Sequence, residues 1–346
     1  MPKGSLPQLS QIKGQKRAAE MLRRLLKARL AGRVYLFLGP EGSGKAEAAR
    51  ALAAAWLCQS PKEEGDCCQH CPACLKLAAA SHPDLVILEP LPDKETIGIE
   101  QAQDLIKSLR FAPLEAETRF VIIPQAERLS LYAANALLKT LEEPPEETVI
   151  ILTAASAEAL PPTLISRCQT VAFQPLTEEL LASELAARFK LSPPQARLAS
   201  GLLAGRLKAG AGFEPASLSE RRDQLLGFLG ALSPKDPAGL FDLAEKLAKE
   251  EDDLFLAILM AWQRDLLVQA SGVSEEKLVN CDRADLLASQ AKVADVFDLV
   301  ARLEAVFEAE AALQARANTR LALEALLLKV SPFGQALAKK AIGAWP

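Results

Sequence analysis

One glycine-rich segment has the residue types and spacing of a loop that binds phosphate. Residues 39–45 read GPEGSGK and lie between an apolar run, residues 34–38, and an alanine-rich stretch, residues 46–57, that is typical of a helix. In this context glycines let backbone N–H groups converge on phosphate oxygens, while the lysine reaches the outer phosphates. A strand-to-helix turn that binds nothing is the alternative. The candidate residues for binding ATP or ADP are Gly39, Gly42, Gly44 and Lys45.

The positions at which a nucleotide hydrolase holds Mg²⁺ carry other residues. Ala46, which has no hydroxyl, follows the lysine, and the apolar run 120–123 ends in Pro124 and Gln125 rather than in acids. Without the metal and without a base that orients water, the charge that develops on a transferred phosphoryl group is not neutralised. The sequence therefore predicts very slow hydrolysis, with Glu127 as the nearest acid that could replace the missing ones.

A group of cysteines has the spacing of metal ligands. The chain has seven cysteines, an odd number, and five of them lie within residues 58–74, which does not resemble a secreted disulfide framework. A closed set of four thiolates leaves no position for water, which predicts a structural Zn²⁺ worth on the order of 10 kcal/mol to the local fold. Cys67 or His70 as a ligand, and buried thiols without metal, are the alternatives. The predicted ligands are Cys58, Cys68, Cys71 and Cys74.

Length and composition limit the class of protein. With 346 residues, half of them hydrophobic, the chain is expected to form two or three domains with a substantial core. Its formal net charge of −4 argues against a generally basic, DNA-coating protein. The N-terminal region has no signal-like apolar stretch, and no run reaches the ~18 to 20 residues of a membrane span. A cytoplasmic protein without a membrane partner is therefore expected.

The order of apolar runs predicts a parallel sheet followed by helices. Helical patterns alternate with strand-like runs, as in α/β proteins. Residues 177–208 read as short helices broken at 192–194, at Gly201 and at Gly205, and the glycine-containing segment 208–219 precedes a long helical tail. The expected strands are residues 34–38, 85–88, 120–123, 148–152 and 170–173.

Four further stretches carry a family resemblance. They are residues 134–145 (ANALLKTLEEPP), with a helix expected over 135–145, residues 160–168 (LPPTLISRC), residues 81–84 (SHPD) and residues 317–324 (ANTRLALE). With the cysteine spacing, they resemble the clamp-loader branch of the AAA+ proteins over essentially the whole chain. The γ-phosphate sensor of active relatives falls near Ala154 and Ala155, so the chain resembles the disabled members of that branch.

The resemblance implies an architecture. It is an α/β AAA+ P-loop domain with a five-stranded parallel sheet over residues 1–174, including a zinc module at 58–74. A small helical lid domain over 175–212 and an all-α collar domain over 213–346 follow.

The resemblance also implies a function. The chain would be a non-hydrolysing scaffold in the DNA polymerase III clamp loader, a hetero-oligomeric ring with gamma or tau and delta subunits. The ring would use ATP on other subunits to load the beta sliding clamp onto primed DNA during replication. Arg167 would stabilise charge in a neighbour's ATP site, on a turn shaped by Ser166 and Cys168. From spacing alone, a cation favoured by a helix dipole explains Arg167 equally well.

Two other functions remain open at this point. An active ATPase subunit like gamma or tau would need Glu127 or a partner group in place of the missing acids. A zinc-dependent DNA-binding module is the alternative from a different class, and it would show a steep salt dependence of DNA affinity.

Overall fold

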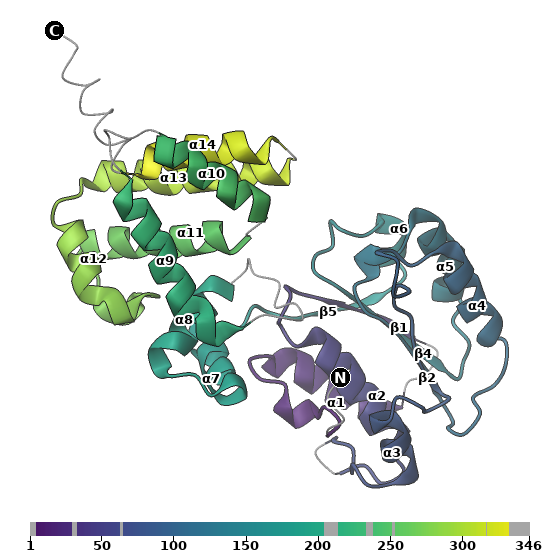
Figure 1. Cartoon of the computed structure of the whole chain (residues 1–346). Coiled ribbons are helices and arrows are strands. Elements are labelled where there is room, and N and C mark those ends of the chain that lie inside the picture. Colours follow the sequence, from purple (N-terminus) through teal and green to yellow (C-terminus); the bar gives the residue numbers. More distant parts are fainter. Residues whose placement is uncertain are drawn as a thin grey trace. The chain divides into compact units, whose positions relative to one another are not determined.

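The five apolar runs form one parallel sheet in the computed structural model of the chain (Figure 1). The sheet order is β2-β3-β4-β1-β5, and every neighbouring pair of strands is parallel, which confirms the predicted α/β fold. The strands are β1 (Arg33–Leu38), β2 (Leu85–Ile87), β3 (Arg119–Ile123), β4 (Thr148–Ala154) and β5 (Gln169–Ala172). The structure describes residues 5–29, 33–62, 65–203, 214–232, 238–250, 253–315 and 317–331.

Helices cover both faces of this sheet, because the strands are apolar on both faces. Tyr35 and Phe37 of β1 belong to the core on the side of α1, α2 and α3, whereas Val34 and Leu36 belong to the core on the side of α4, α5 and α6. Figure 1 shows the two helix layers on either side of the strands. These helices are α1 (Lys16–Ala28), α2 (Lys45–Leu57), α3 (Pro72–Ala78), α4 (Ile99–Ser108), α5 (Leu131–Glu142) and α6 (Pro162–Ile165), with short 3-10 turns η1 (Leu9–Gln11) and η2 (Ala126–Arg128).

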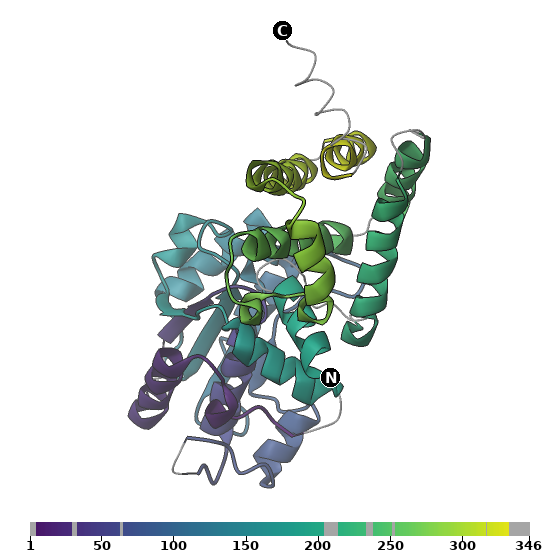
Figure 2. The ribbon, with the colours of Figure 1, turned by 90° about the vertical axis from the view of Figure 1, so that its left-hand side faces the viewer.

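The contacts divide the chain into two compact units, Met1–Leu176 and Thr177–Pro346. In the second unit the described residues form only helices and turns, as the leucine and alanine spacing predicts. Its helices are α7 (Glu178–Phe189), α8 (Pro193–Leu203), α9 (Leu218–Ala231), α10 (Ala238–Glu250), α11 (Asp253–Ala270), α12 (Ala284–Ala291), α13 (Val296–Gln314) and α14 (Thr319–Val330), with 3-10 turns η3 (Pro215–Ser217), η4 (Glu275–Lys277) and η5 (Cys281–Arg283). Figure 2 shows α13 and α14 side by side in yellow-green.

The predicted boundary between lid and collar, 212/213, lies outside the described residues. Helices α7 and α8, the predicted lid, share one hydrophobic core with α9, α10, α11, α13 and α14. The division into three domains therefore stays a prediction. The structure itself separates only the two units, Met1–Leu176 and Thr177–Pro346.

Two sequence-based expectations about helices are wrong in detail. Helix α5 ends at Glu142 and does not continue to residue 145, because a residue that precedes a proline is disfavoured in the helical region. Gly201 lies inside α8 and does not break it. A Cβ at Gly201 would lie 2.4 Å from Val279, so glycine serves a close approach between α8 and the segment before η5.

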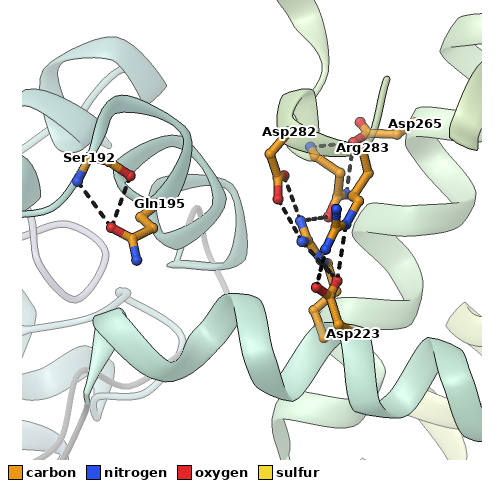
Figure 3. A network of polar contacts seen from close by, with 8 residues as sticks. Ser192, Gln195, Asp223, Asp265, Asp282 and Arg283 are labelled. Atoms are coloured by element: carbon orange, nitrogen blue, oxygen red, sulfur yellow. Dashed lines mark hydrogen bonds and ion pairs between the residues drawn. The ribbon is translucent and has the colours of Figure 1, made fainter. Parts of the chain in front are cut away.

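A buried arginine, Arg222, joins helices of the second unit; Figure 3 labels the residues Asp223, Asp265, Asp282 and Arg283 of the same polar network. Arg222 of α9 donates two hydrogen bonds of 2.7 Å to Asp282 of η5, and its Nε lies 3.0 Å from Asp223. Asp265 of α11 accepts from the backbone N–H groups of Val279 and Asn280, at 3.2 and 2.7 Å. The hydrogen bond from Arg222 holds the pKa of Asp282 below its usual range. The pairing explains how a cation can be almost fully buried here.

Within the described part of the chain, no helix is both long enough and apolar enough to cross a lipid bilayer.

Candidate functional site

The glycine-rich loop lies at the carboxyl edge of the sheet, between β1 and α2. Gly42 and Gly44 have φ angles of 77° and 84°, a region that side chains disfavour, and Gly44 caps the N-terminus of α2. Gly39 is required for a different reason, because a Cβ there would lie 2.3 Å from the carbonyl oxygen of Phe173. The loop therefore has the backbone of a phosphate-binding turn, placed where α/β sheets bind ligands.

Lys45 is buried within this loop. Its Nζ donates to the carbonyl oxygen of Pro40 at 3.1 Å, and only 8% of the residue is exposed. Burial lowers the pKa of Lys45, and the negative charges of Glu127 and Glu41 partly oppose that shift. Ser43 is also buried, and its Oγ has no hydrogen-bond partner among the described residues. The ammonium group of Lys45 thus binds a carbonyl oxygen of its own loop. A bound phosphate would have to replace that carbonyl oxygen as its acceptor.

The end of β3 presents no carboxylate to the loop. Pro124 follows the strand, and Gln125 adopts a left-handed conformation with φ 53°. The backbone N–H of Gln125 donates to Oγ1 of Thr153 on β4 at 3.2 Å. With Ala46 at the second residue of α2, the two side-chain positions that ordinarily hold Mg²⁺ in this class of site have no oxygen ligand.

Glu127 lies in η2, beyond the end of β3. Its Oε1 accepts from the backbone N–H of Ala155 at 3.4 Å, so the carboxylate is bound at the end of β4, where the sensor position was predicted. Its Oε2 is buried without a hydrogen-bond partner among the described residues. Glu127 is near enough to Lys45 to influence the pKa of the lysine. Its backbone lies in η2, however, and not at positions 124 and 125, where the acids of an active site would lie.

A glutamine that no sequence motif marks joins the loop to the end of the sheet. Gln15 is 2% exposed, and its Nε2 donates to the carbonyl oxygens of Ser43 at 3.1 Å and Gln174 at 2.6 Å. Its Oε1 accepts from the backbone N–H of Gln174 at 2.9 Å. A single glutamine before a helix carries no motif, so only the fold identifies this contact.

The four cysteines selected by spacing lie together. The sulfurs of Cys58, Cys68, Cys71 and Cys74 lie within 4.8 Å of one another, and all four residues are buried. The Sγ atoms of Cys58 and Cys71 are 3.9 Å apart, as are those of Cys68 and Cys74. A tetrahedron with Zn–S bonds of about 2.3 Å has edges of about 3.8 Å. The chemistry and the spacing of these donors both fit Zn²⁺.

The alternative ligands are directed elsewhere. Cys67 lies outside this set, with its Sγ near Nε2 of Gln8, and His70 places Nδ1 2.8 Å from the carbonyl oxygen of Cys68. A backbone N–H at His70 contributes most to lowering the pKa of Cys68 to about 6, against the effect of burial. That shift favours the thiolate of Cys68, the form that binds metal, whereas burial raises the pKa values of Cys58 and Cys74 in the same set.

Arg167 follows the short helix α6 on the surface of the first unit. Its Nε and Nη2 donate to Oε2 of Glu142 at 3.2 and 3.0 Å, and its Nη1 donates to the carbonyl oxygen of Thr163 at 2.8 Å. Its side chain is 29% exposed. The sequence does not reveal this partner, because a lone glutamate near the end of a helix carries no motif; only the fold brings Glu142 to Arg167.

The residues on either side of Arg167 close the helix. The hydroxyl of Ser166 donates to the carbonyl oxygen of Thr163 at 3.1 Å, and the thiol of Cys168 lies 3.2 Å from the carbonyl oxygen of Leu164. Burial raises the pKa of Cys168 to about 12, so this thiol remains protonated. Both side chains thus satisfy carbonyl groups at the end of α6.

Together, the five-stranded parallel sheet and the loop define an α/β P-loop domain in which the magnesium-binding positions carry other residues. Two family profiles match the chain. Residues 14–177 match the profile described as DNA polymerase III, delta subunit, and residues 216–331 match the profile described as DNA polymerase III, delta subunit, C terminal.

Individual relatives agree with these matches. The chain is 29% identical over 299 residues to the DNA polymerase III subunit delta' of Bacillus subtilis (strain 168), covering 85% of this chain and 89% of that protein. It is 31% identical over 242 residues to subunit delta' of Escherichia coli (strain K12), covering 70% and 71%. Similarity to B. subtilis subunit tau, 33% over 175 residues, covers 50% of this chain and 30% of tau. The chain belongs to the family of DNA polymerase III delta' subunits, which are clamp-loader components, and the predicted resemblance is confirmed.

Proposed function

We propose that this chain is a non-hydrolysing scaffold of the clamp loader that supplies Arg167 in trans to the ATP site of a neighbouring subunit. The absence of hydrolysis is supported by the residues at the two Mg²⁺-binding positions beside the loop. Ala46 and Pro124 have no side-chain oxygen for Mg²⁺, Gln125 has an uncharged amide in place of a carboxylate, and Oγ1 of Thr153 accepts from the backbone N–H of Gln125. Without the metal, a bound nucleotide would lack the charge neutralisation that phosphoryl transfer requires.

The loop is part of the proposal as a passive site. Gly39, Gly42, Gly44 and Lys45 would hold the phosphates of ATP or ADP without turnover. The N-terminus of α2 and the left-handed glycines support phosphate binding. Binding would require Lys45 to exchange the carbonyl oxygen of Pro40 for phosphate oxygens.

Arg167 carries the second half of the proposal. It is a partly exposed cation on the surface of a domain whose own site lacks a catalytic set. An arginine that reaches a neighbour's transferred phosphoryl group accelerates hydrolysis by about 10³ to 10⁵ in enzymes that use one. Ser166 and Cys168 support this role by closing the turn from which Arg167 projects.

The partners follow from the family. The assembly would be a hetero-oligomeric ring with gamma or tau and delta subunits, in the cytoplasm, that loads the beta sliding clamp onto primed DNA. The four-cysteine set would hold a structural Zn²⁺ in the P-loop domain, since four thiolates leave no open coordination position. Such a metal would stabilise the segment that connects α2 and α3 and would take no part in phosphoryl transfer.

The decisive experiment is an ATPase assay on the reconstituted ring, with every site disabled except the one beside this chain. Arg167→Ala should lower the turnover of that site by about 10³-fold or more. Arg17→Ala, an exposed arginine on α1, is the matched control and should leave it unchanged. Unchanged turnover in Arg167→Ala, with assembly intact, would remove the finger role.

The second candidate function is an active ATPase subunit. It is favoured by the position of Glu127, whose buried Oε2 has no partner among the described residues and whose charge acts on Lys45. Magnesium-dependent phosphate release by the purified chain, abolished in Glu127→Gln, would establish it. The scaffold proposal expects no release above background.

A further inference from the structure

The side chain of Arg167 is oriented by one carboxylate. Oε2 of Glu142 accepts from Nε at 3.2 Å and from Nη2 at 3.0 Å, so one oxygen binds one edge of the guanidinium group. The carbonyl oxygen of Thr163 accepts from Nη1 at 2.8 Å, on another side of the group. Three hydrogen bonds from two elements, α5 and α6, therefore fix the plane of the guanidinium group.

These contacts leave part of the group available. A guanidinium group has five N–H bonds, one on Nε and two on each terminal nitrogen. Three of them are used by Glu142 and Thr163. One N–H on Nη1 and one on Nη2 have no partner in the described part of the chain. Two terminal N–H donors can bind a phosphate group, which accepts hydrogen bonds through several oxygens.

The position of Glu142 does not stabilise its own helix. It is the last residue of α5, where the negative end of the helix dipole disfavours an acid. Its side chain is 61% exposed, so burial does not select a carboxylate either. Contact with Arg167 accounts for a carboxylate at this position.

We propose that Glu142 is the positioning residue of the arginine finger: it binds the Nε edge of Arg167 and leaves the terminal N–H groups directed at the terminal phosphate of a nucleotide on the neighbouring subunit. The inference rests on the proposed function of Arg167. A donor that is already oriented needs less reorganisation when charge develops in the transition state. Loss of Glu142 should therefore lower kcat and leave the KM for ATP unchanged.

Activity of the reconstituted ring provides the first test, again with only the neighbouring site active. Glu142→Ala should lower kcat about 10-fold with the KM for ATP unchanged. Glu143→Ala, which removes the adjacent exposed acid, is the matched control and should have no effect. In the Arg167→Ala background, Glu142→Ala should have no further effect, because the residue acts only through the arginine.

The pairing of Glu142 with Arg167 can also be tested on the isolated chain, without measuring ATP turnover. In ¹⁵N-labelled protein, Glu142→Gln should shift the Nε–H resonance of Arg167 and accelerate exchange of that proton, whereas Glu143→Gln should change neither. If Arg167→Ala lowers turnover but Glu142→Ala does not, the positioning role is overturned and the finger stands. If Arg167→Ala has no effect, the finger role fails and the positioning role fails with it. An unchanged Nε–H resonance in Glu142→Gln overturns the pairing itself.

Discussion

Gln15 and Gln174 exchange hydrogen bonds in both directions although they are 159 positions apart in the chain. Gln15 precedes α1, and Gln174 follows β5. The same amide also donates to the carbonyl oxygen of Ser43 in the glycine-rich loop. One buried side chain thus joins the start of the P-loop domain, its loop and the end of its sheet.

We expect Gln15→Ala to destabilise the P-loop domain by about 2 kcal/mol, because three hydrogen bonds are lost and the carbonyl group of the buried Ser43 loses this donor. Native-state hydrogen exchange of the Gln174 amide measures the effect directly. Gln11→Ala removes an exposed glutamine one turn earlier and should leave that exchange rate unchanged. Equal protection of the Gln174 amide in both variants would contradict the proposed importance of the contact.

Asp84 should make the stability of the P-loop domain sensitive to acid. Burial would raise its pKa, but N–H groups of Leu114, Glu115 and Ala116 at 2.7 to 2.9 Å, together with Arg119, hold the pKa below its usual value. A lowered folded-state pKa contributes stability that is complete above the unfolded value of about 3.9 and is lost as pH falls through the folded value.

The measurement is urea unfolding at a series of pH values. Asp84→Asn should cost on the order of 3 kcal/mol at neutral pH, because it leaves Arg119 without its buried partner. The cost should shrink as the pH falls below about 4, because the carboxylate of the unfolded chain then binds a proton while that of the folded chain stays ionised to lower pH. A cost that is independent of pH would exclude the charge as the cause.

Metal analysis should distinguish the two adjacent cysteines. We expect about one Zn²⁺ per chain, near-complete loss of it in Cys68→Ser, and full retention in Cys67→Ala, because only Cys68 has its sulfur within the set of four. Removal of the metal by a chelator should expose the amides of α3 to hydrogen exchange. Retention of zinc in Cys68→Ser would assign the ligand to another residue.

Arg222 should be far more important for stability than an exposed arginine of the same unit. Arg222→Met removes the buried partner of Asp282 and Asp223. It should lower the free energy of unfolding by about 3 to 5 kcal/mol. Arg320→Met removes an arginine that also pairs with two acids, Glu245 and Glu324, but is half exposed, so its cost should be much smaller. Urea unfolding of the two variants compares them; similar costs would argue against the buried network.

The elements of the first unit are readable from the sequence because their signals are local. The strand runs are apolar on both faces, and the loop motif requires glycine at Gly42 and Gly44 whatever surrounds it. Helix ends were less accurate. Gly201 looked like a helix break, whereas the structure shows it inside α8, where contact with Val279 excludes a side chain.

Motifs with fixed spacing are evident from the sequence alone: the phosphate-loop glycines, Pro124 and Gln125 in place of acids directly after β3, and four thiols close enough in the chain to share one metal. Contacts between distant segments emerge only in the folded chain, such as Gln15 with Gln174, Glu142 with Arg167 and Arg222 with Asp282. The physical reason is that a local motif depends on backbone conformation over a few residues. A long-range polar pair depends on how helices pack, and a lone glutamine, glutamate or arginine in the sequence does not reveal its partner.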